Sequence, residues 1–466
     1  MEALAAMDAL LLAGERLGSA MHVGAVLIMT PPADAGSDYV DELHRQSLLD
    51  THRLDPRLSR HPHRGVETGG IWVWRQAREV DLRRHLRRIT LPAGSDTAQM
   101  WELISRLHGE RLDMAAPLWT SCLIDGLPDG RFAFYIKIHH IVIDGIGGLR
   151  MISDSLSPDP SRRSMPPFYA DKSAPPHRRP GLPNPLAAVR AVANAAAAGL
   201  DLSRRATAAE VAAIVGTLTG DSVTGPLAAP HTRFNASLGP DRAAVGISLD
   251  RSRIHAVRHA AAVTANDVVT AVVAGALRSW MIAHDELPHR TLVAMCPVSA
   301  RTRDEDGSTQ DGNLFGLGLC PLGTDMAAPA ERLALIHRAM AEIKHRVAAQ
   351  GPEVTLAVMG PAIASTVAAP LLGLGSLVPP SSNLAISSVP GPRERMYFNG
   401  ALLEDIFPVS SAFDGMGLNV TVCSYAERLE IGYVTDPEIM PGVAELTGLT
   451  GQALTELEAA VGVSTP

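Results

Sequence analysis

Apolar side chains recur along this chain with two different periods. Short runs that are continuously apolar, or that alternate between apolar and polar residues, predict β-strands. These runs are residues 23–29, 72–74, 132–140, 244–249 and 292–297. Longer segments with apolar residues three and four positions apart predict helices. These segments are a leading stretch at the N-terminus and residues 97–112, 265–283 and 329–348. Helices that alternate with strands predict an α/β fold.

The length of 466 residues is too great for one ordinary hydrophobic core, so we expect two domains. Residues 1–156 form the first α/β half. Residues 157–234 are expected to connect the halves, because they are rich in Pro, Ser and Arg up to about 185 and then rich in Ala at helical spacing. Residues 235–466 form a second half with a similar order of elements.

The composition is that of a globular protein with a formal charge of -8, which argues against nucleic acid as a partner. Four cysteines lie far apart in apolar contexts and lack the spacing of a zinc site, so we expect reduced core residues and no metal. They are Cys122, Cys296, Cys320 and Cys423.

The N-terminal segment does not have the charge pattern of a secretory signal. Its apolar stretch from Ala9 to Ala13 follows Glu2 and Asp8 where a basic region is required. No run of about 20 strongly apolar residues is free of helix breakers, so no spanning helix is expected. We therefore expect a cytoplasmic protein that contacts membranes only peripherally.

The segment from Arg131 to His140 is the clearest candidate for chemistry. Its alternation places His140 on the same strand face as Phe134 and Ile138, so strand parity predicts that His140 points inward among apolar side chains. His139 falls on the other face. An imidazole at the end of a strand titrates near neutral pH and suits a general base that takes a proton from an attacking hydroxyl.

A bare His-His pair is more often structural than catalytic. Here, however, Asp144 and Gly145 follow His139 and His140 in the pattern HHxxxDG. Four specified residues match this pattern by chance in a chain of this length only roughly a few times in a thousand. The complete motif therefore favours the catalytic interpretation.

The chain resembles the bacterial wax ester synthase/acyl-CoA:diacylglycerol acyltransferases, which belong to the larger superfamily of CoA-dependent acyltransferases that share HHxxxDG. Further blocks of the family occur in the expected order over nearly the whole chain. They are Met21-His22-Val23-Gly24, Pro117-Leu118-Trp119, Asn266-Asp267, Pro297-Val298-Ser299-Ala300-Arg301, Gly312-Asn313, Ser387-Ser388-Val389-Pro390-Gly391-Pro392 and Ser424-Tyr425. The resemblance implies a two-domain CoA-dependent acyltransferase fold, with mixed sheets, helices and an active-site tunnel between the domains.

The resemblance also implies roles for single residues. His140 is the general base, His139 sets the loop and the tautomer, and Asp144 shapes the loop by holding an arginine, for which Arg301 is the candidate. Gly145 is expected to give the turn its backbone freedom.

Two other blocks of the family have roles that the residues alone leave open. Asn266 and Asp267 are implied to bind substrate, although N-capping of the following helix, by Thr264 or Asn266, also explains this block. Pro117 and Trp119 are expected to give structural support.

Residues 53–88 contain ten arginines and no lysine, a local positive excess in an acidic protein. A solvated surface is the usual meaning of such a run. The other two interpretations are docking of the CoA phosphates and attraction to an anionic membrane.

The resemblance implies an O-acyltransferase that moves a long-chain acyl group from acyl-CoA, a co-substrate, to diacylglycerol or a fatty alcohol, with no permanently bound cofactor. It further implies peripheral attachment to the inner face of the membrane or to lipid bodies. The alternatives are peptide condensation, acyl transfer to a complex cell-envelope lipid, and a non-catalytic lipid-binding or lipid-coat protein on the same fold.

Overall fold

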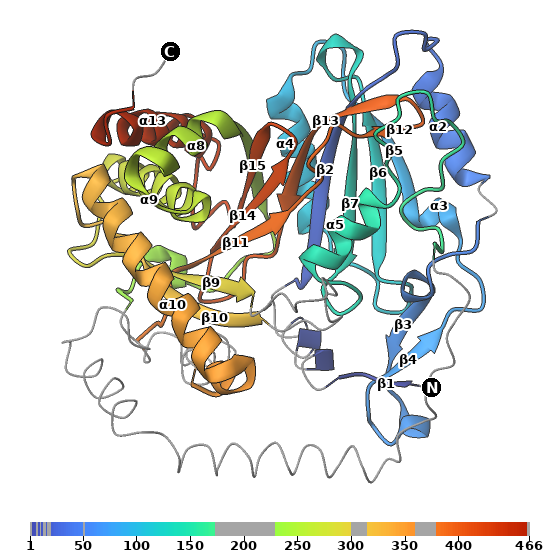
Figure 1. Ribbon diagram of the computed structural model, residues 1–466. Coiled ribbons are helices and arrows are strands. Elements are labelled where there is room, and N and C mark those ends of the chain that lie inside the picture. Colours follow the sequence, from blue (N-terminus) through green and yellow to red (C-terminus); the bar gives the residue numbers. More distant parts are fainter. Residues whose placement is uncertain are drawn as a thin grey trace.

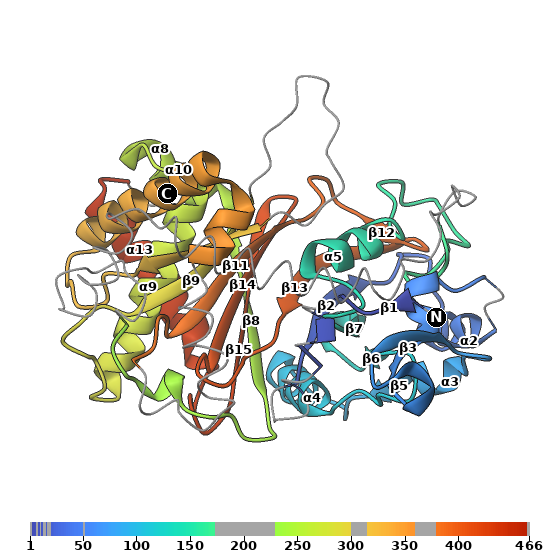
Figure 2. The ribbon, with the colours of Figure 1, turned by 90° about the horizontal axis from the view of Figure 1, so that it is seen from below.

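The computed structural model describes residues 2–5, 8–9, 11–12, 15, 20–49, 52–172, 229–299, 315–358 and 379–463. Most of the expected connector, residues 173–228, lies outside these ranges, and so does Arg301. Within them the chain forms two six-stranded sheets that lie next to each other, with helices against both (Figures 1 and 2). The expected mixed α/β architecture is confirmed.

The N-terminal sheet contains mostly antiparallel strands. Its strand order is β12 (Tyr397–Phe398), β13 (Ala401–Val409), β2 (His22–Thr30), β7 (Phe132–His139), β6 (Trp119–Asp125) and β5 (Leu86–Thr90). Only β5 and β6 pair in parallel. A small third sheet, of order β1 (Glu2–Ala3), β4 (Val73–Gln76) and β3 (Arg60–His63), lies beside it.

Helices cover both faces of the N-terminal sheet (Figure 2). On one face α4 (Thr97–Gly109) begins with a capping box between Asp96 and Gln99 and buries Trp101 and Ile104 against the core. On the other face α5 (Gly145–Ser153) packs Leu149 and Ile152 into a second core cluster. The short helices α2 (Tyr39–Leu48) and α3 (Leu82–His85) complete this half.

The C-terminal sheet has the strand order β10 (Phe315–Pro321), β9 (Val293–Ser299), β11 (Leu384–Pro390), β14 (Leu418–Tyr425), β15 (Arg428–Thr435) and β8 (Ala243–Asp250). Helices cover its outer side (Figure 1). They are α8 (Arg251–Ala261), α9 (Ala265–Ala283), α10 (Pro329–Val358) and α13 (Glu445–Ala460). The central helix α9 is buried on most of its circumference, as a helix that is apolar on nearly all sides must be.

One strand couples the two sheets. Although β13 comes from the C-terminal part of the chain, it pairs antiparallel with β2 of the N-terminal sheet. The pairing shifts register between Leu403 and Asp405, which marks a β-bulge. A division of the chain at residue 235 remains a prediction, but residues 397–409 belong to the N-terminal sheet in space.

Most elements lie where the pattern predicts them. The predicted helix 265–283 coincides with α9. The strands β2 and β8 are each one residue longer at both ends than the predicted strands 23–29 and 244–249. The predicted helix 97–112 ends at Gly109, whereas the helix predicted at 329–348 continues to Val358.

All four cysteines are buried and unpaired by disulfides, as expected for reduced core residues. Over the described ranges no single helix has the length and apolar composition needed to cross a membrane, whereas α8 and α9 pass that test only as a pair bent by 104°.

A carboxyl pair lies where β13 meets the C-terminal sheet. Glu430 on β15 is fully buried, and the carboxyl group of Asp405 on β13 is close enough to raise its pKa. Burial first, and then the nearby Asp405, raises the pKa of Glu430 to about 8, and burial also raises the pKa of Asp405. Ser248 donates a hydrogen bond of 3.1 Å to Glu430. Glu430 therefore keeps its proton at neutral pH.

The raised pKa of Glu430 predicts that the protein loses stability as the pH rises from acid to slightly alkaline values. The folded protein keeps a proton that the unfolded chain releases near pH 4.5, so the free energy of unfolding should fall as pH rises from about 4.5 to about 8. Glu430→Gln should remove this slope, and its melting temperature should gain on that of the unmodified protein between pH 5 and pH 9. Glu456→Gln, at an exposed position of α13, is the control. A difference in melting temperature that is constant with pH would contradict the raised pKa of Glu430.

Candidate active site

The HHxxxDG segment begins at the last residue of β7 and ends at the start of α5. Neighbouring strand segments hold its first two residues by their backbones: the His139 N–H donates to the Leu118 carbonyl at 3.0 Å, and the His140 N–H donates to the Met21 carbonyl at 2.8 Å. The His139 carbonyl then accepts the Val142 N–H at 2.9 Å, which closes a turn. The position of His140 is therefore set by three separate segments of the chain.

His139 is completely buried and is hydrogen-bonded through both ring nitrogens. Its Nδ1 accepts the backbone N–H of Ile141 at 3.1 Å, so this nitrogen carries a lone pair and Nε2 carries the hydrogen. That Nε2–H donates to a carboxylate oxygen of Glu15, which is itself 3% exposed. The side chain of His139 therefore points into the protein and stiffens the turn from inside.

His140 is only partly buried and lies at the turn itself. Burial is the main cause that lowers the pKa of His140, Asp144 opposes it by raising the pKa, and the nearby His139 lowers it further. The imidazole is therefore neutral at neutral pH, which is the state that accepts a proton. Asp8 also faces this pair: burial raises the pKa of its carboxyl group, and His140 and His139 counteract that rise.

Asp144 is the N-cap of α5. Its Oδ1 accepts the Gly147 N–H at 2.6 Å, while Oδ2 is buried and accepts no hydrogen bond from the residues that the structure describes. The hydrogen bond from Gly147 gives the Asp144 carboxylate a structural role at the start of α5. The expected pairing with Arg301 stays a prediction, because Arg301 lies outside the described residues.

Gly147, not Gly145, is the glycine whose small size this loop requires. A Cβ at Gly147 would lie 2.9 Å from Ile143 Cγ1 and 3.0 Å from Asp144 Oδ1. Gly145 is the first residue of α5 and is not among the described residues with positive φ, so the expected gain in backbone freedom is not seen there. A Cβ on Gly145 would instead be 3.8 Å from Val389 of β11.

The C-terminal half faces the motif through β11. Val389 lies next to Gly145, and its neighbour Ser388 donates a hydrogen bond of 2.7 Å to Asn266 Oδ1 at the start of α9. Asn266 therefore belongs to the same neighbourhood as the HHxxxDG loop. Oδ1 is the acceptor in this bond, so the amide nitrogen of Asn266 is left as its donor group.

Asp267 has a different position from Asn266. It is 1% exposed and forms a capping box with Thr264, whose N–H donates to Asp267 Oδ2 at 2.9 Å. The same oxygen is 2.8 Å from His337 Nδ1 on α10. Thr264 is thus the N-cap, one of the two caps expected, and Asp267 holds the beginning of α9 against α10.

The face of β7 that carries His139 is buried too, and it is polar. Strand parity assigned only the His140 face to the interior, but α4 covers the opposite face, where Tyr135 and Lys137 lie. Lys137 Nζ donates to the carbonyls of Leu107 at 2.6 Å and Glu110 at 2.5 Å at the end of α4. Burial lowers the pKa of Lys137 to about 8.

Two further histidines extend this polar layer. Tyr135 Oη donates to His108 Nδ1 at 2.8 Å, and His108 Nε2 donates to the Ser410 carbonyl at 3.1 Å. His22, opposite His139 on β2, donates from Nε2 to the His108 carbonyl at 2.7 Å. Burial lowers the pKa of His108 to about 3 and that of His22 well below its ordinary value. Both rings are therefore neutral hydrogen-bonding parts of the core.

Trp119 packs in the core of the N-terminal half. It is 0% exposed, stacks on His85 with ring centroids 4.5 Å apart, and donates from Nε1 to the Leu58 carbonyl at 2.9 Å. Pro117 and Trp119 also frame Leu118, whose carbonyl holds His139. This block supports the motif from behind β7.

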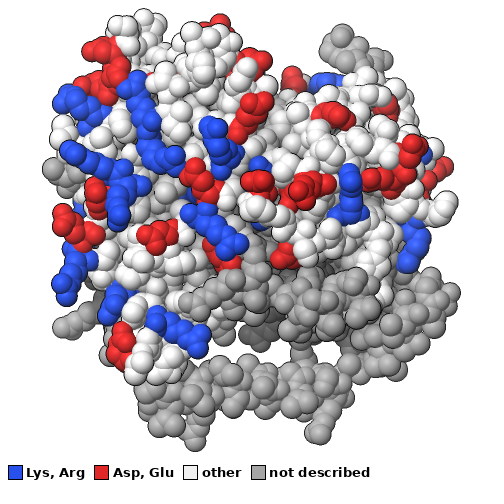
Figure 3. Space-filling view, turned by 180° about the vertical axis from the view of Figure 1, so that it is seen from behind, with Lys and Arg blue, Asp and Glu red and all other residues white. Residues whose placement is uncertain are grey.

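The basic run is less positive in space than in sequence. Acidic residues from other segments pair with it, since Glu2 lies 3.0 Å from Arg60, Glu110 lies 2.7 Å from Arg87, and Asp125 lies 2.5 Å from Arg88. On the face that Figure 3 shows, Lys and Arg are more frequent on the left, over the N-terminal half, where Asp and Glu lie among them. Among the residues that the structure describes, no group of three or more His, Cys, Asp or Glu side chains is arranged to hold a metal ion.

Known proteins with the same organisation were found by sequence. Residues 4–269 match the family model of the wax ester synthase/diacylglycerol acyltransferase catalytic domain, and residues 311–458 match that of the C-terminal domain of the same proteins. A putative diacylglycerol O-acyltransferase of Mycobacterium tuberculosis is 37% identical over 98% of this chain and 99% of its own length. A probable diacylglycerol O-acyltransferase of the same organism is 35% identical over 95% and 96%.

Solved structures give the same result. A wax ester synthase/diacylglycerol acyltransferase from Marinobacter aquaeolei VT8 superposes with a TM-score of 0.79 at 30% identity, covering 99% of this chain and all of that one. The first condensation domain of the CDA synthetase superposes with a TM-score of 0.56 at 18% identity, covering 100% and 97%, and shares the fold alone. The resemblance stated from the motifs is confirmed.

The Glu15 contact predicts a positioning effect. Glu15→Ala leaves the buried Nε2–H of His139 without its acceptor, which should lower the free energy of unfolding by about 1–3 kcal/mol and lower the turnover number with it. Glu15→Gln keeps an acceptor oxygen and should recover most of both losses. Chemical denaturation and turnover measurements check this, with Glu67→Ala on the exposed hairpin as the control. Unchanged stability and turnover in Glu15→Ala would contradict the assigned role.

Proposed function

The chain belongs to the wax ester synthase/diacylglycerol acyltransferase family, and on that premise we propose that it transfers a long-chain fatty acyl group from acyl-CoA to the free hydroxyl of diacylglycerol, with fatty alcohols as further acceptors. The products are triacylglycerol or wax ester and free CoA. The observation that carries the site assignment is the turn at His139 and His140, where one imidazole is locked into the core and the next is neutral and partly exposed.

In the proposed reaction His140 is the general base. Its neutral ring takes the proton of the acceptor hydroxyl while that oxygen attacks the thioester carbonyl. The C–S bond then breaks, and the imidazolium returns the proton to the leaving thiolate of CoA. No covalent intermediate with the protein is required, because the hydroxyl itself is the nucleophile. A neutral His140 is needed at the start, and burial keeps it neutral.

We assign supporting roles to the other motif residues. His139 holds the turn through Glu15, and Asp144 shapes the loop by capping α5. Asn266 is positioned to donate from its amide nitrogen to the thioester oxygen or the acceptor hydroxyl, because Ser388 occupies its Oδ1. Asp267 contributes to substrate binding indirectly, since it anchors the start of the helix that carries Asn266.

We also propose that the protein works at a lipid surface. The hairpin of β3 and β4 exposes Val66 to 97% and Ile71 to 52% at its tip. Exposed apolar side chains flanked by arginines suit the interface between an anionic headgroup layer and acyl chains. Arg64 lies over the Trp72 ring at 6.0 Å on the same hairpin. Attachment by this hairpin would bring the protein to its water-insoluble acceptor.

The function is tested with purified protein, hexadecanoyl-CoA and either detergent-dispersed diacylglycerol or hexadecanol, while free thiol and ester are both measured. His140→Ala should lower ester formation by about 100-fold to 10,000-fold with little change in melting temperature, because it removes the proton acceptor and little core volume. His259→Ala, at an exposed position of α8, should keep full activity.

The outcomes separate the possible functions. Thiol release without ester would mean hydrolysis of acyl-CoA. An unmodified protein that releases no thiol with either acceptor would contradict the enzyme assignment and favour a lipid-coat role.

Lipid-surface attachment is tested with vesicles of phosphatidylglycerol and phosphatidylcholine. The double variant Val66→Ser/Ile71→Ser should lose most of its sedimentation with these vesicles, because its two exposed apolar side chains are gone. Ile282→Ser is the matched control, since Ile282 is 49% exposed at the far end of α9. Equal loss in the control, or no loss in the double variant, would assign attachment to another surface.

A further inference from the structure

Only three lysines occur in the whole chain, at positions 137, 172 and 344. Nearly all of its basic side chains are arginines, whose guanidinium group stays charged and is not a nucleophile. A lysine amine, by contrast, attacks a carbonyl carbon when the amine is neutral and accessible. The surroundings of these three amines therefore determine which lysine is open to chemical modification.

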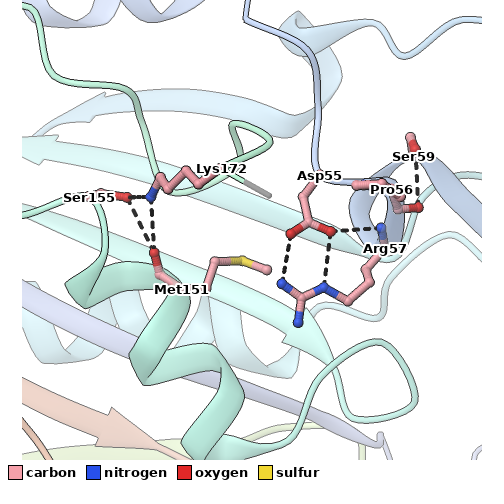
Figure 4. Close-up of polar contacts among 7 residues, drawn as sticks. All are labelled: Asp55, Pro56, Arg57, Ser59, Met151, Ser155 and Lys172. Carbon is pink, nitrogen blue, oxygen red and sulfur yellow. Dashed lines mark hydrogen bonds and ion pairs between the residues drawn. The ribbon is translucent and has the colours of Figure 1, made fainter. Parts of the chain in front are cut away.

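The amine of Lys172 is held at the end of α5 by two acceptors. Its Nζ donates to the hydroxyl of Ser155 and, at 3.3 Å, to the Met151 carbonyl (Figure 4). Ser155 donates to the same carbonyl at 3.3 Å. A neutral amine has two hydrogens and one lone pair, so these two bonds use both hydrogens. The lone pair of the neutral amine then points away from both acceptors, on a residue that is exposed.

The backbone on the N-terminal side of Lys172 is fixed as well. The Asp55 N–H donates to the Tyr169 carbonyl at 2.9 Å. Two residues further along, the Asp171 N–H donates to the Arg53 carbonyl at 2.6 Å. The segment before Lys172 is thus paired with the segment before β3, so the side chain starts from a defined position beside α5.

The surroundings of Lys172 also make its amine easier to deprotonate than that of an ordinary lysine. Although the residue is exposed, its Nζ is turned back onto the protein, and this partial burial lowers the pKa of Lys172 to about 8. Asp154 and Asp55 oppose the decrease by raising the pKa. Both carboxylate oxygens of Asp55 accept hydrogen bonds from Arg57, at 3.0 and 2.7 Å (Figure 4). About one tenth of the Lys172 amine is therefore neutral at pH 7.

The other two lysines each lack one of these properties. Burial lowers the pKa of Lys137 to about 8 too, but Lys137 is 3% exposed, so a thioester in solution does not reach its amine. Lys344 on α10 is exposed, but it makes no hydrogen bond with the residues that the structure describes. Among the three lysines, Lys172 alone combines exposure with an amine that two acceptors orient.

We propose that Lys172 is a modification site that is N-acylated by acyl-CoA. The lone pair of the amine attacks the thioester carbonyl, the C–S bond breaks, and an amide bond forms between Nζ and the acyl group. The thiolate of CoA leaves and takes up the proton that the nitrogen loses, so the products are acyl-lysine and free CoA. The modification goes beyond the acyl transfer proposed above and rests on it only for the presence of acyl-CoA at the protein.

Acylation of Lys172 changes the contacts at the end of α5. The amide nitrogen keeps one hydrogen, so it serves either the Ser155 hydroxyl or the Met151 carbonyl but not both. The positive charge that Asp154 faces is lost at the same time. Because α5 begins at the HHxxxDG loop, the modification alters the far end of the helix that carries this loop.

The proposal is tested on the full-length protein with acetyl-CoA as the thioester and without any acceptor alcohol. Acetylation of each lysine is followed by mass spectrometry of peptides. At pH 7 the initial rate at Lys172 should exceed that at Lys344 by about tenfold or more, and Lys137 should stay unmodified. The expected ratio is modest because nucleophilicity falls as basicity falls, as it does for thiols.

The pH dependence of the rate adds a second measurement. Acetylation of Lys172 should become faster with pH and level off above about pH 8. Nα-acetyllysine in solution, which has an ordinary amine with a pKa of about 10.4, should react faster with each step through pH 9. A lysine that is merely exposed would follow the free derivative and show no plateau.

Two conservative variants serve as controls. Lys172→Arg keeps the charge and the hydrogen-bond donors, so it should fold like the unmodified protein while its acetylation at pH 7 falls to the level of Lys344. Lys344→Arg is the matched substitution on α10 and should leave acetylation of Lys172 unchanged. Equal rates at Lys172 and Lys344 in the unmodified protein, or a rate at Lys172 without a plateau, would overturn the proposal.

Failure of the modification and failure of the proposed function give different results. A protein that forms ester from acyl-CoA and an alcohol but is not acetylated at Lys172 contradicts only the modification. A protein that is acetylated at Lys172 but forms no ester with either acceptor contradicts only the proposed transferase.

Discussion

The hydrogen bond between His139 and Glu15 is the contact on which the rest of the site depends. It joins a residue near the N-terminus to the end of a central strand, and both side chains are almost completely buried. A carboxylate and an imidazole in such surroundings are stable only together, because either one alone would be a buried polar group without a partner. Since Nε2 of His139 serves Glu15, Nδ1 is left to accept the Ile141 N–H. The turn that presents His140 is held in place because the two ring nitrogens of His139 have these separate partners.

The site is completed by elements from both halves of the chain. α5 starts from the cap at Asp144 and approaches β11, whose Ser388 orients Asn266. The crossover strand β13 pairs with β2, the same strand that pairs with β7 up to His139. A shift between the halves would therefore move Asn266 relative to His140. Glu430, whose pKa is raised to about 8 by burial and by Asp405, lies at this junction, so the stability of the junction depends on pH.

The sequence predicted the elements whose burial follows a regular period. The helix at 265–283 and the strands around β2, β7 and β8 are of this kind, and the HHxxxDG motif located the site. Parity failed to identify the buried polar face of β7, because an alternating strand with helices on both sides has no outer face. Tyr135 and Lys137 lie on that face with His139, and their imidazole and carbonyl partners on α4 show that it is buried.

Long-range partners could not be predicted at all. Glu15 and Asp8 lie more than 120 residues before the histidines they approach, and no local pattern connects them. The pairing of β13 with the N-terminal sheet cannot be predicted from one sequence either, since the alternating pattern of β13 fits either sheet. The arginine run looked like a strongly positive surface, yet acidic residues from distant segments neutralise much of it.

The central claim is that a neutral His140 is presented by a His139 whose Nε2–H is held by Glu15. Two-bond ¹H–¹⁵N NMR correlations of the imidazole rings, recorded as a function of pH, report the tautomer and the titration of each histidine directly. The account predicts that His139 is the Nε2–H tautomer and that His140 titrates below its ordinary value of 6.5. A His139 protonated on Nδ1, or a His140 that titrates above 6.5, would contradict it.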